Sequence, residues 1–252
     1  MDLGIKGKRA LVIGGSAGLG QASAEALAAE GVDIAIFARD PAKIDAAAAS
    51  ISGNHGIRCE GFAGDITVQD DVRALRDWTA RTGGIDILVL NTPRPPSPMH
   101  EFLAETEDAR WQRAYADQLE GALFVLRRLT PLLLNKGWGR IVAITSASIK
   151  NPYPRHALST IFRAGVQAAL KHLSEEIAEH GVTVNAVAPA TVLTPTFAQF
   201  HNLEARIAAT PLKRAGTMEE LGGTVAFLAS QYAGYITGET IQFDGGRSRS
   251  LV

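Results

Sequence analysis

The sequence predicts an α/β protein: one domain, residues 1–252, in which a doubly wound parallel sheet of about seven strands carries helices on both faces. Two observations support this prediction. Short apolar runs alternate with longer segments of helical periodicity along the whole chain. The first apolar run, residues 10–13, is followed by a glycine-rich loop and an alanine-rich helix, which is the order typical of the first unit of such a sheet.

The loop after this first apolar run has the composition of an anion site. Glycines stand at positions 14, 15, 18 and 20, before the alanine-rich segment 22–30. A strand, a tight loop and a helix N-terminus direct backbone N–H groups at one point, where the helix dipole also favours negative charge. We therefore predict that the phosphates of a dinucleotide bind here. The residues assigned to this contact are Gly14, Ser16, Gly18, Leu19 and Gly20.

The later elements follow the same alternation. Strands are expected at 33–38, 57–62, 85–90, 139–145, 183–188 and 240–243, and helices at 41–51, 68–82, 106–135, 156–180 and 218–229. Strands joined by helices run parallel with right-handed crossovers, so their carboxyl ends meet at one edge, where ligands bind. The polar, proline-containing segment 190–212 follows one of these ends and is expected to form a lid over the substrate.

A cluster of prolines follows the strand expected at 85–90. It consists of Pro93, Pro95, Pro96 and Pro98, and it lies at the edge of the sheet where ligands bind. A rigid loop and a wall of the substrate site both explain the cluster, and the two interpretations are compatible.

Composition limits the classes of partner and the compartment. A formal net charge of -1, with acids and bases interspersed, provides no basic field for nucleic acid or for an anionic membrane. No stretch reaches the ~18 apolar residues of a membrane span, so we expect a soluble, cytoplasmic protein. Cys59 is the only cysteine, which excludes an internal disulfide and a thiolate metal cluster. The histidines have no ligand spacing, so no metal site is predicted.

Several short motifs occur in a fixed order. Gly14, Gly18 and Gly20 come first, followed by residues 64–66 (GDI), 86–93 (DILVLNTP), 184–189 (VNAVAP) and 243–246 (FDGG). In these motifs the chain resembles the short-chain dehydrogenase/reductase family over nearly its whole length. The resemblance implies a Rossmann fold, a nicotinamide dinucleotide cofactor, a small-molecule carbonyl or alcohol substrate, and a homo-oligomer that is a tetramer or a dimer.

The resemblance also implies which residues contact the cofactor. Asp65 matches the aspartate that contacts the adenine, and Asn91 is the one of the family's two adjacent asparagines that this chain retains. The segment 184–194 matches the one that closes on the nicotinamide, with Ala190 in place of the usual glycine. The cofactor residues assigned in this way are Asp65, Ile66, Asn91, Arg163, Pro189, Ala190, Val192 and Thr194.

The end of the strand expected at 33–38 indicates which cofactor is used. An acid at this point binds both ribose hydroxyls of NAD and repels a 2′-phosphate, whereas an arginine pairs with that phosphate. Here Ala38 occupies the position of the acid, and Arg39 follows it. The sequence therefore favours NADP(H), with NAD(H) as the alternative. Asp40, directly before Pro41, is expected to cap the next helix.

The catalytic positions depart from the family pattern. Ser146 matches the serine that holds the substrate oxygen, but Ser159 and Arg163 stand where the family has its tyrosine and lysine. Gln118 stands at the position of the family's asparagine. A serine hydroxyl is a far weaker acid than a phenol, so Ser159 could orient a carbonyl but cannot simply replace the tyrosine. Arg163 can donate to ribose hydroxyls, but as a permanent cation it is no proton relay.

Two other residues could supply the proton. His156 precedes Ser159 by three positions and titrates near neutrality, and Tyr153 lies in the loop before it. Each residue also has a purely structural interpretation. His156 could simply be a histidine near the start of a helix, and Tyr153 could simply pack over the loop. These alternatives remain open at the level of the sequence.

Three functions are compatible with these residues. The first is an NADP(H)-dependent oxidoreductase in which Ser146 holds the substrate oxygen. The second is a nucleotide-binding protein without redox turnover, acting as a regulator or a partner subunit, and the third is non-redox carbonyl chemistry on the same scaffold. The resemblance implies that the homo-oligomer forms through the helices expected at 106–135 and 156–180, with the C-terminal strand completing a second interface. Apolar residues along 106–135 that exceed what one sheet face needs support this prediction. They are Leu119, Ala122, Leu123, Leu126 and Leu129.

Overall fold

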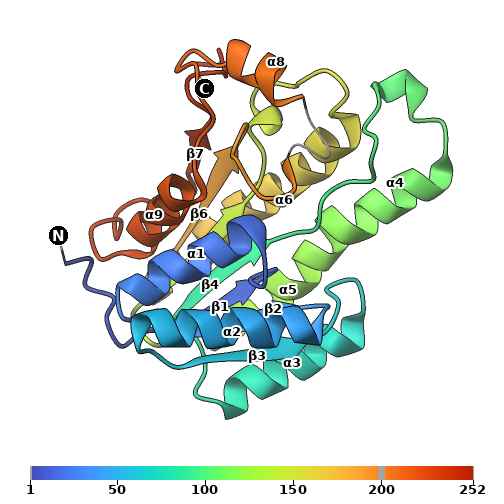
Figure 1. The fold of residues 1–252 in the computed structure, drawn as a ribbon. Helices are drawn as coiled ribbons and strands as arrows, with labels where there is room; N and C mark the ends of the chain where they lie inside the picture. Colours follow the sequence, from blue (N-terminus) through green and yellow to red (C-terminus); the bar gives the residue numbers. More distant parts are fainter. Residues whose placement is uncertain (1, 198–201, 252) are drawn as a thin grey trace.

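The structure, a computed structural model, describes residues 2–197 and 202–251. Seven strands form one sheet in the order β3-β2-β1-β4-β5-β6-β7, and all neighbouring pairs are parallel (Figure 1). The order reverses between β1 and β4, the switch point at which the carboxyl ends of a doubly wound sheet leave a crevice. This confirms the predicted α/β fold with helices on both faces.

The strands are β1 (Arg9–Ile13), β2 (Asp33–Ala38), β3 (Cys59–Ala63), β4 (Ile87–Asn91), β5 (Gly139–Ile144), β6 (Val182–Pro189) and β7 (Thr240–Phe243). The α-helices are α1 (Gly18–Ala29), α2 (Pro41–His55), α3 (Gln69–Arg81), α4 (Asp108–Tyr115), α5 (Gly121–Leu129), α6 (Ala157–Glu176), α8 (Leu203–Ala208) and α9 (Met218–Ala229). Shorter turns are η1 (Phe102–Ala104), η2 (Ala116–Glu120), η3 (Thr130–Leu132), η4 (Ala147–Ile149) and η5 (Ala178–His180).

Two apolar cores lie on the two faces of the sheet. Val12 and Ile36 belong to the core formed with α1, α2 and α9, whereas their neighbours Ile13 and Phe37 belong to the core formed with α3, α5 and α6. Figure 1 shows helices on both sides of the sheet. Successive side chains of a strand point to opposite faces, so a strand covered on both sides must be apolar at every position. This explains why the strands of this chain appear as continuous apolar runs.

The predicted element boundaries hold within a few residues, with two differences. The helix expected at 106–135 is divided into α4, the π-helical turn η2 and α5, and the 3-10 turn η3 follows at Pro131. A proline lacks the N–H that a continuing helix needs, which explains the end at this point. The short helix α8 lies in a segment that was expected only to be polar and proline-containing.

The predicted cap of α2 is confirmed. Asp40 is the N-cap, and its side chain accepts a hydrogen bond from the Lys43 backbone N–H at 3.2 Å. This bond is the main cause that lowers the pKa of the Asp40 carboxyl, and the positive charge of Lys43 lowers it further. Asp40 is therefore a structural residue.

The apolar stripe along α5 is largely used inside the chain. Ala122, Leu126 and Leu129 are buried in the core between α5 and the sheet, and Leu119 packs against the same core. Leu123 and Leu119 are only half-buried, so part of the stripe stays accessible, and the homo-oligomer stays a prediction. The large apolar side chains that remain exposed include Tyr115 on α4 and Ile161 on α6, and also Phe227, Tyr235 and Ile241 on α9, the loop after it and β7.

Two statements hold for residues 2–197 and 202–251. In this part of the chain no helix is both long enough and apolar enough to cross a membrane. The same residues contain no group of three or more His, Cys, Asp or Glu placed to hold a metal ion. Cys59 is half-buried in β3, and burial raises the pKa of its thiol to about 12, so it is a packing residue and not a reactive thiolate.

Candidate functional site

The glycine loop closes so tightly that only glycine fits at two of its positions. Gly14 has φ +69, and a Cβ on Gly20 would lie 2.1 Å from the carbonyl oxygen of Gly14. The side chain of Asn91, at the end of β4, packs against both glycines, since their Cβ positions are 2.9 and 3.0 Å from its Nδ2. Asn91 therefore supports the loop from the neighbouring strand.

The N-terminus of α1 is open. Its N-cap, Ala17, has no side chain that could bond the first backbone N–H groups, and no acidic residue stands in the first turn. Gly18 has nothing within 4 Å of the place where its Cβ would be. Backbone donors without a cap, at the positive end of a helix, are the groups that bind phosphate.

A cavity of about 480 Å³ begins at this helix end and extends along the carboxyl ends of β4, β5 and β6. Among the predicted residues it brings together Gly18, Leu19, Asn91, Ser146, His156, Ser159, Arg163, Pro189, Ala190, Val192 and Thr194. Gly14, Ser16, Gly20, Arg39, Asp65, Ile66, Gln118 and Tyr153 do not line it. The cavity therefore contains the helix end at one side and most of the predicted catalytic residues at the other.

Ser146 follows β5 and is the N-cap of η4. Its Oγ lies 2.9 Å from Ser148 Oγ and accepts a hydrogen bond from the Ser148 backbone N–H at 3.3 Å. Ser148 is completely buried, and either hydroxyl of the pair can be the donor. The sequence reasoning missed Ser148, although the spacing Ser-Ala-Ser indicates a hydroxyl pair.

Ser159 and Arg163 are one helical turn apart on α6 and interact directly. Arg163 Nη1 donates to Ser159 Oγ at 2.8 Å, and Nη2 donates to the Pro93 carbonyl oxygen at 3.3 Å. The Nε atom is enclosed and has no acceptor among the described residues. Burial, with a smaller contribution from nearby Arg94, lowers the pKa of Arg163 to about 10, so the group stays charged at neutral pH.

His156 lies between a carbonyl and a guanidinium. Its Nδ1 is 2.7 Å from the Pro154 carbonyl oxygen and must donate to it, and its Nε2 is 3.1 Å from Arg206 Nη2, from which it accepts. This is the neutral tautomer. Burial, opposed by the bond to Pro154, lowers the pKa of His156, and the positive charge of Arg206 lowers it further.

Tyr153 and Gln118 are buried beside the cavity. The Tyr153 ring packs against the His156 ring at 5.7 Å and lies 4.3 Å below the Arg247 guanidinium. Burial raises the pKa of the Tyr153 hydroxyl. Gln118 lies on η2, which packs against α6, and neither polar atom of its side chain has a hydrogen-bond partner among the described residues.

The residues assigned to the adenosine half lie on the β2 and β3 side. Arg39 is exposed directly after β2. Asp65 Oδ1 accepts hydrogen bonds from the Thr67 backbone N–H at 2.9 Å and from Thr67 Oγ1 at 2.8 Å, and Ile66 is buried. This turn fixes the chain beside the end of β2.

Two cavity arginines were not predicted. Arg94 follows Pro93 in the proline cluster, and its Nη2 lies 3.5 Å from Thr194 Oγ1 across the cavity. Arg206 lies on α8, in the segment expected to form the lid. The position of Arg94 after β4, at the ligand edge, was a usable signal, whereas nothing in the sequence indicates where Arg206 points. Residues 198–201 of the expected lid lie outside the described residues.

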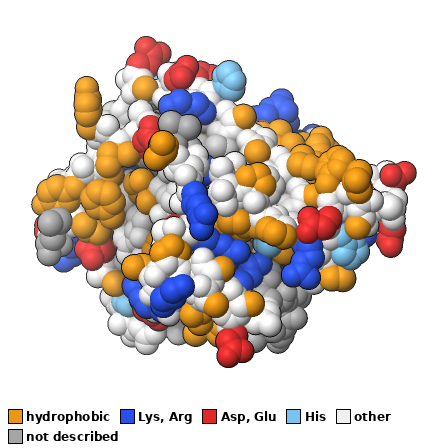
Figure 2. Space-filling view, turned by 90° about the horizontal axis from the view of Figure 1, so that it is seen from above, with side chains coloured by type: hydrophobic (Ala, Val, Ile, Leu, Met, Phe, Trp, Pro, Cys, Tyr) orange, Lys and Arg blue, Asp and Glu red, His pale blue; other side chains and the backbone are white. Residues whose placement is uncertain are grey.

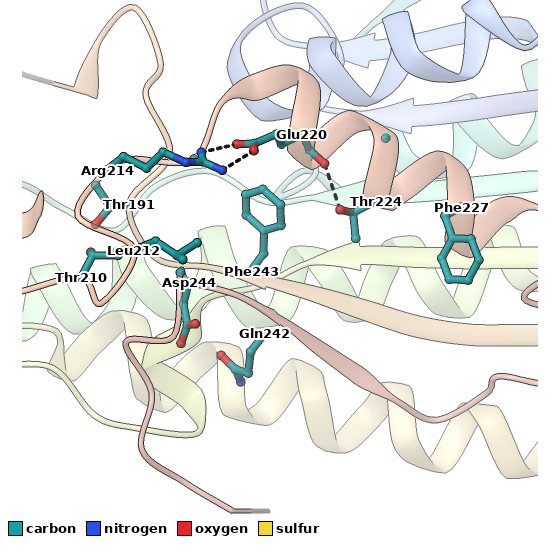
Figure 3. A pocket seen from close by; sticks show the side chains of 13 residues that line it. Thr191, Thr210, Leu212, Arg214, Glu220, Thr224, Phe227, Gln242, Phe243 and Asp244 are labelled. Atoms are coloured by element: carbon teal, nitrogen blue, oxygen red, sulfur yellow. Dashed lines mark hydrogen bonds and ion pairs between the residues drawn. The ribbon is translucent and has the colours of Figure 1, made fainter.

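A second hollow, of about 570 Å³, lies between α9, β7 and residues 210–216 (Figure 3). Arg214 and Glu220 form a two-pronged ion pair across it, at 2.6 and 2.8 Å. Asp244 accepts hydrogen bonds from the backbone N–H groups of Gly246 and Ser248. Among the described residues, the side-chain oxygen of Thr191 and both polar atoms of Gln242 have no hydrogen-bond partner, and none of the predicted catalytic residues lines this hollow.

The known proteins that this chain is similar to are described as reductases and dehydrogenases. Residues 14–248 match the protein family described as Enoyl-(Acyl carrier protein) reductase. The chain is 32% identical over 245 residues to a 3-oxoacyl-[acyl-carrier-protein] reductase of Staphylococcus epidermidis, covering 95% of this chain and 98% of that one. It is 32% identical over 254 residues to an L-rhamnose 1-dehydrogenase (NAD(P)(+)) of Sphingomonas sp., covering 96% of each. L-Sorbose reductase from Gluconobacter frateurii, solved with NADPH and L-sorbose, superimposes with a TM-score of 0.92 at 29% identity, covering 100% of both chains.

Proposed function

The chain belongs to the short-chain dehydrogenase/reductase family, and from this premise we propose that it is an NADP(H)-dependent oxidoreductase that acts on a carbonyl or alcohol group. Similar proteins include a 3-oxoacyl reductase and an NADPH-bound sorbose reductase, whose names describe carbonyl reduction. We further propose that residues 1–252 act as one domain, with 190–212 as its lid. The support for the lid is Arg206, which reaches the cavity from α8.

The residues of this chain fit the cofactor. The close approach of Gly20 to the Gly14 carbonyl, the open N-terminus of α1 and the enclosed Nε of Arg163 are features that a bound dinucleotide would explain. The proposed phosphate-binding residues are Gly14, Ser16, Gly18, Leu19 and Gly20. Those proposed for the rest of the cofactor are Arg39, Asp65, Ile66, Asn91, Arg163, Pro189, Ala190, Val192 and Thr194. When bound, the nicotinamide supplies or accepts a hydride.

The catalytic proposal rests on Ser146, Ser159 and Arg163. Because Arg163 donates to Ser159 Oγ, the hydroxyl hydrogen of Ser159 is available for a substrate oxygen. Ser146, whose Oγ is held by Ser148, provides a second hydroxyl to the same cavity. Two hydroxyl donors backed by a guanidinium stabilise negative charge that develops on the substrate oxygen. No residue of this set has the acidity of the family's tyrosine, so the last proton comes from water.

His156 takes a positioning role in this proposal. Its proton is bonded to the Pro154 carbonyl and its lone pair faces Arg206, so neither nitrogen offers a proton to the cavity. Tyr153 and Gln118 are not cavity-lining residues and act, in our proposal, through the packing of α6.

The observation that carries the function is the presence, in one cavity, of the open α1 N-terminus and the residues Ser146, Ser159 and Arg163. The test is a panel of ketones, aldehydes and alcohols, followed at the nicotinamide absorbance. Turnover by the wild type supports the proposal. Tight NADPH binding without turnover on the whole panel, also after Ser159→Tyr with Arg163→Lys, would favour the second candidate, a dinucleotide-binding protein without redox chemistry. That candidate is favoured by one observation, the absence of the tyrosine and lysine.

The proposed preference for NADP(H) is tested at Arg39. Arg39 is exposed at the end of β2, where no acid stands at position 38, and a charge-assisted pair with a 2′-phosphate is worth about 1.5 to 3 kcal/mol. We expect NADPH to bind more tightly than NADH, and Arg39→Ala to weaken NADPH binding by about ten- to a hundredfold while NADH binding stays unchanged. Calorimetric titration measures both affinities. Equal affinities of the wild type for the two cofactors would contradict the assignment.

A further inference from the structure

The hydroxyl of Ser148 is shielded from solvent and bonded to a cavity residue. Charged side chains lie at the surface of the molecule (Figure 2), whereas the Ser148 side chain is completely buried, so bulk water cannot bond to it. Among the described residues its Oγ has one hydrogen-bond partner, Ser146 Oγ at 2.9 Å. Ser146 lines the cavity and Ser148 does not. The pair therefore joins a buried hydroxyl to one that a substrate can reach.

The 3-10 turn η4 holds the two serines together. Ser146 is the N-cap of this turn, and Ser148 lies within it. The Ile149 backbone N–H donates to the Ser146 carbonyl oxygen at 3.1 Å, and the turn packs against α6 and β6. The Ser148 backbone N–H also donates to Ser146 Oγ, at 3.3 Å. The turn thus supplies Ser146 Oγ with an N–H donor, and with an O–H donor whenever the Ser148 hydroxyl takes that role.

A substrate oxygen decides which hydroxyl of the pair donates. Each hydroxyl carries one hydrogen and two lone pairs, and with no third partner either serine can be the donor. A carbonyl oxygen, or the oxyanion that forms from it, can only accept, so Ser146 must give it its single hydrogen. The bond between the two hydroxyls then requires Ser148 as the donor. In this state Ser146 Oγ accepts from the N–H and the O–H of Ser148 and donates to the substrate.

Building on the proposed function, we infer that Ser148 is a positioning residue, whose hydroxyl donates to Ser146 Oγ and directs the Ser146 hydrogen to the substrate oxygen. Linked hydrogen bonds polarise one another when they are shielded from water, so the same bond strengthens Ser146 as a donor. The gain is largest when negative charge has developed on the substrate oxygen, and Ser148 therefore acts on the rate more than on substrate binding. The pair is not a proton path, because the described residues give Ser148 Oγ no second partner.

A double-mutant cycle tests this role on a ketone or aldehyde that the wild type reduces at saturating NADPH. Ser148→Ala should lower kcat about three- to tenfold. The KM of the carbonyl compound and the affinity for NADPH should stay within about twofold of the wild type. In the Ser146→Ala background, Ser148→Ala should change kcat by less than about twofold, because the hydroxyl on which Ser148 acts is gone. A merely structural role predicts the same loss in both backgrounds.

Two further variants separate the hydrogen bond from the volume of the side chain. Ser148→Cys keeps the volume but replaces the hydroxyl by a weak donor, so its kcat should stay close to that of Ser148→Ala. A loss caused by the void that alanine leaves would instead be restored by the sulfur. The control Ser174→Ala removes another buried hydroxyl, bonded to the Lys171 carbonyl oxygen at 2.7 Å on α6, and should leave kcat unchanged. Circular dichroism checks that each variant folds, and Ser148→Cys replaces Ser148→Ala in the cycle if the alanine variant does not.

The outcomes distinguish this inference from the proposed function. A loss of kcat that the Ser146→Ala background abolishes supports the role of Ser148. An unchanged kcat in Ser148→Ala, a wild-type rate in Ser148→Cys or an equal loss in both backgrounds would overturn that role and leave the oxidoreductase in place. Absence of turnover by the wild type on every ketone, aldehyde and alcohol would overturn the oxidoreductase, and the role of Ser148 with it.

Discussion

At the scale of single residues, Ser159 and Arg163 form one unit. The guanidinium donates to the hydroxyl at 2.8 Å, so the oxygen of Ser159 is already an acceptor and its hydrogen points to another group. In the family pattern the corresponding lysine lowers the pKa of a phenol. A guanidinium cannot exchange its proton at neutral pH, and it acts here by charge and orientation instead. The expected consequence is stabilisation of an oxyanion without strong general acid catalysis.

The neutral state of His156 has a consequence for stability. Its pKa in the folded protein is lowered, so below about pH 6.5 the unfolded chain binds a proton that the folded chain does not. The stability that comes from neutral His156 is complete above this pH and is lost as the pH falls. Thermal unfolding followed from about pH 8 to about pH 5.5 should therefore show a larger loss for the wild type than for His156→Gln.

The control for this measurement is His172→Gln, because His172 is an exposed histidine on the same helix. The loss of thermal stability on acidification should be the same in His172→Gln as in the wild type. If His156 is a positioning residue, the pH dependence of turnover is also the same in the wild type and in His156→Gln. A wild-type rate that falls as the pH rises through the imidazole pKa, in a way that His156→Gln abolishes, would make His156 the proton donor.

At the scale of elements, the loop between β1 and α1 depends on the absence of a side chain at Gly20. A Cβ there would meet the Gly14 carbonyl oxygen at 2.1 Å, and backbone cannot yield as a flexible side chain can. The sequence could predict that this loop binds an anion, because its glycines lie between a strand and a helix. It could not predict the support from Asn91, which reaches the loop from another strand.

A pair of glycine substitutions tests this account of the loop. Gly20→Ala should destabilise the protein by about 1 to 3 kcal/mol and weaken NADPH binding, because the loop must open to admit the methyl group. Gly53→Ala is the matched control, since Gly53 lies in α2 with nothing within 4 Å of its Cβ position. It should stabilise the protein by about 0.5 to 1 kcal/mol through helix propensity. Urea unfolding measures both changes, and a neutral Gly20→Ala would contradict the described loop.

At the scale of the whole molecule, the sequence could predict a parallel sheet that is covered on both faces. It could predict only some of the residues that line the cavity. Continuous apolar runs such as 10–13 and 87–90 predict strands covered on both faces, and the parallel order then fixes the ligand edge. Ser146, Ser159 and Arg163 were assigned to the site through the resemblance to the family, and all three line the cavity at this edge. The sequence could not place Arg206 at the cavity, because the direction of its side chain depends on how α8 packs.

The predicted homo-oligomer also involves the surface around the C-terminal strand. Phe227 and Ile241 are exposed on α9 and on the edge strand β7, and Tyr232 and Tyr235 are exposed in the loop after α9. An unpaired edge strand beside exposed aromatic residues is a surface that association covers. We expect a dimer or tetramer by light scattering, and Ile241→Glu should reduce the molar mass. The control Val68→Glu changes an exposed residue before α3 and should not. A monomeric wild type would reject this prediction.

The central claim is that the cavity transfers a hydride between NADP(H) and a carbonyl carbon with Ser146, Ser159 and Arg163 in place of the usual set. The direct measurement uses NADPH labelled with deuterium at the nicotinamide C4 and a panel of ketones and aldehydes. The account predicts deuterium on the carbinol carbon of the product alcohol, and a rate about a hundred- to a thousandfold lower for Ser146→Ala with NADPH affinity unchanged. A wild type that binds NADPH but transfers no label to any member of the panel would contradict it.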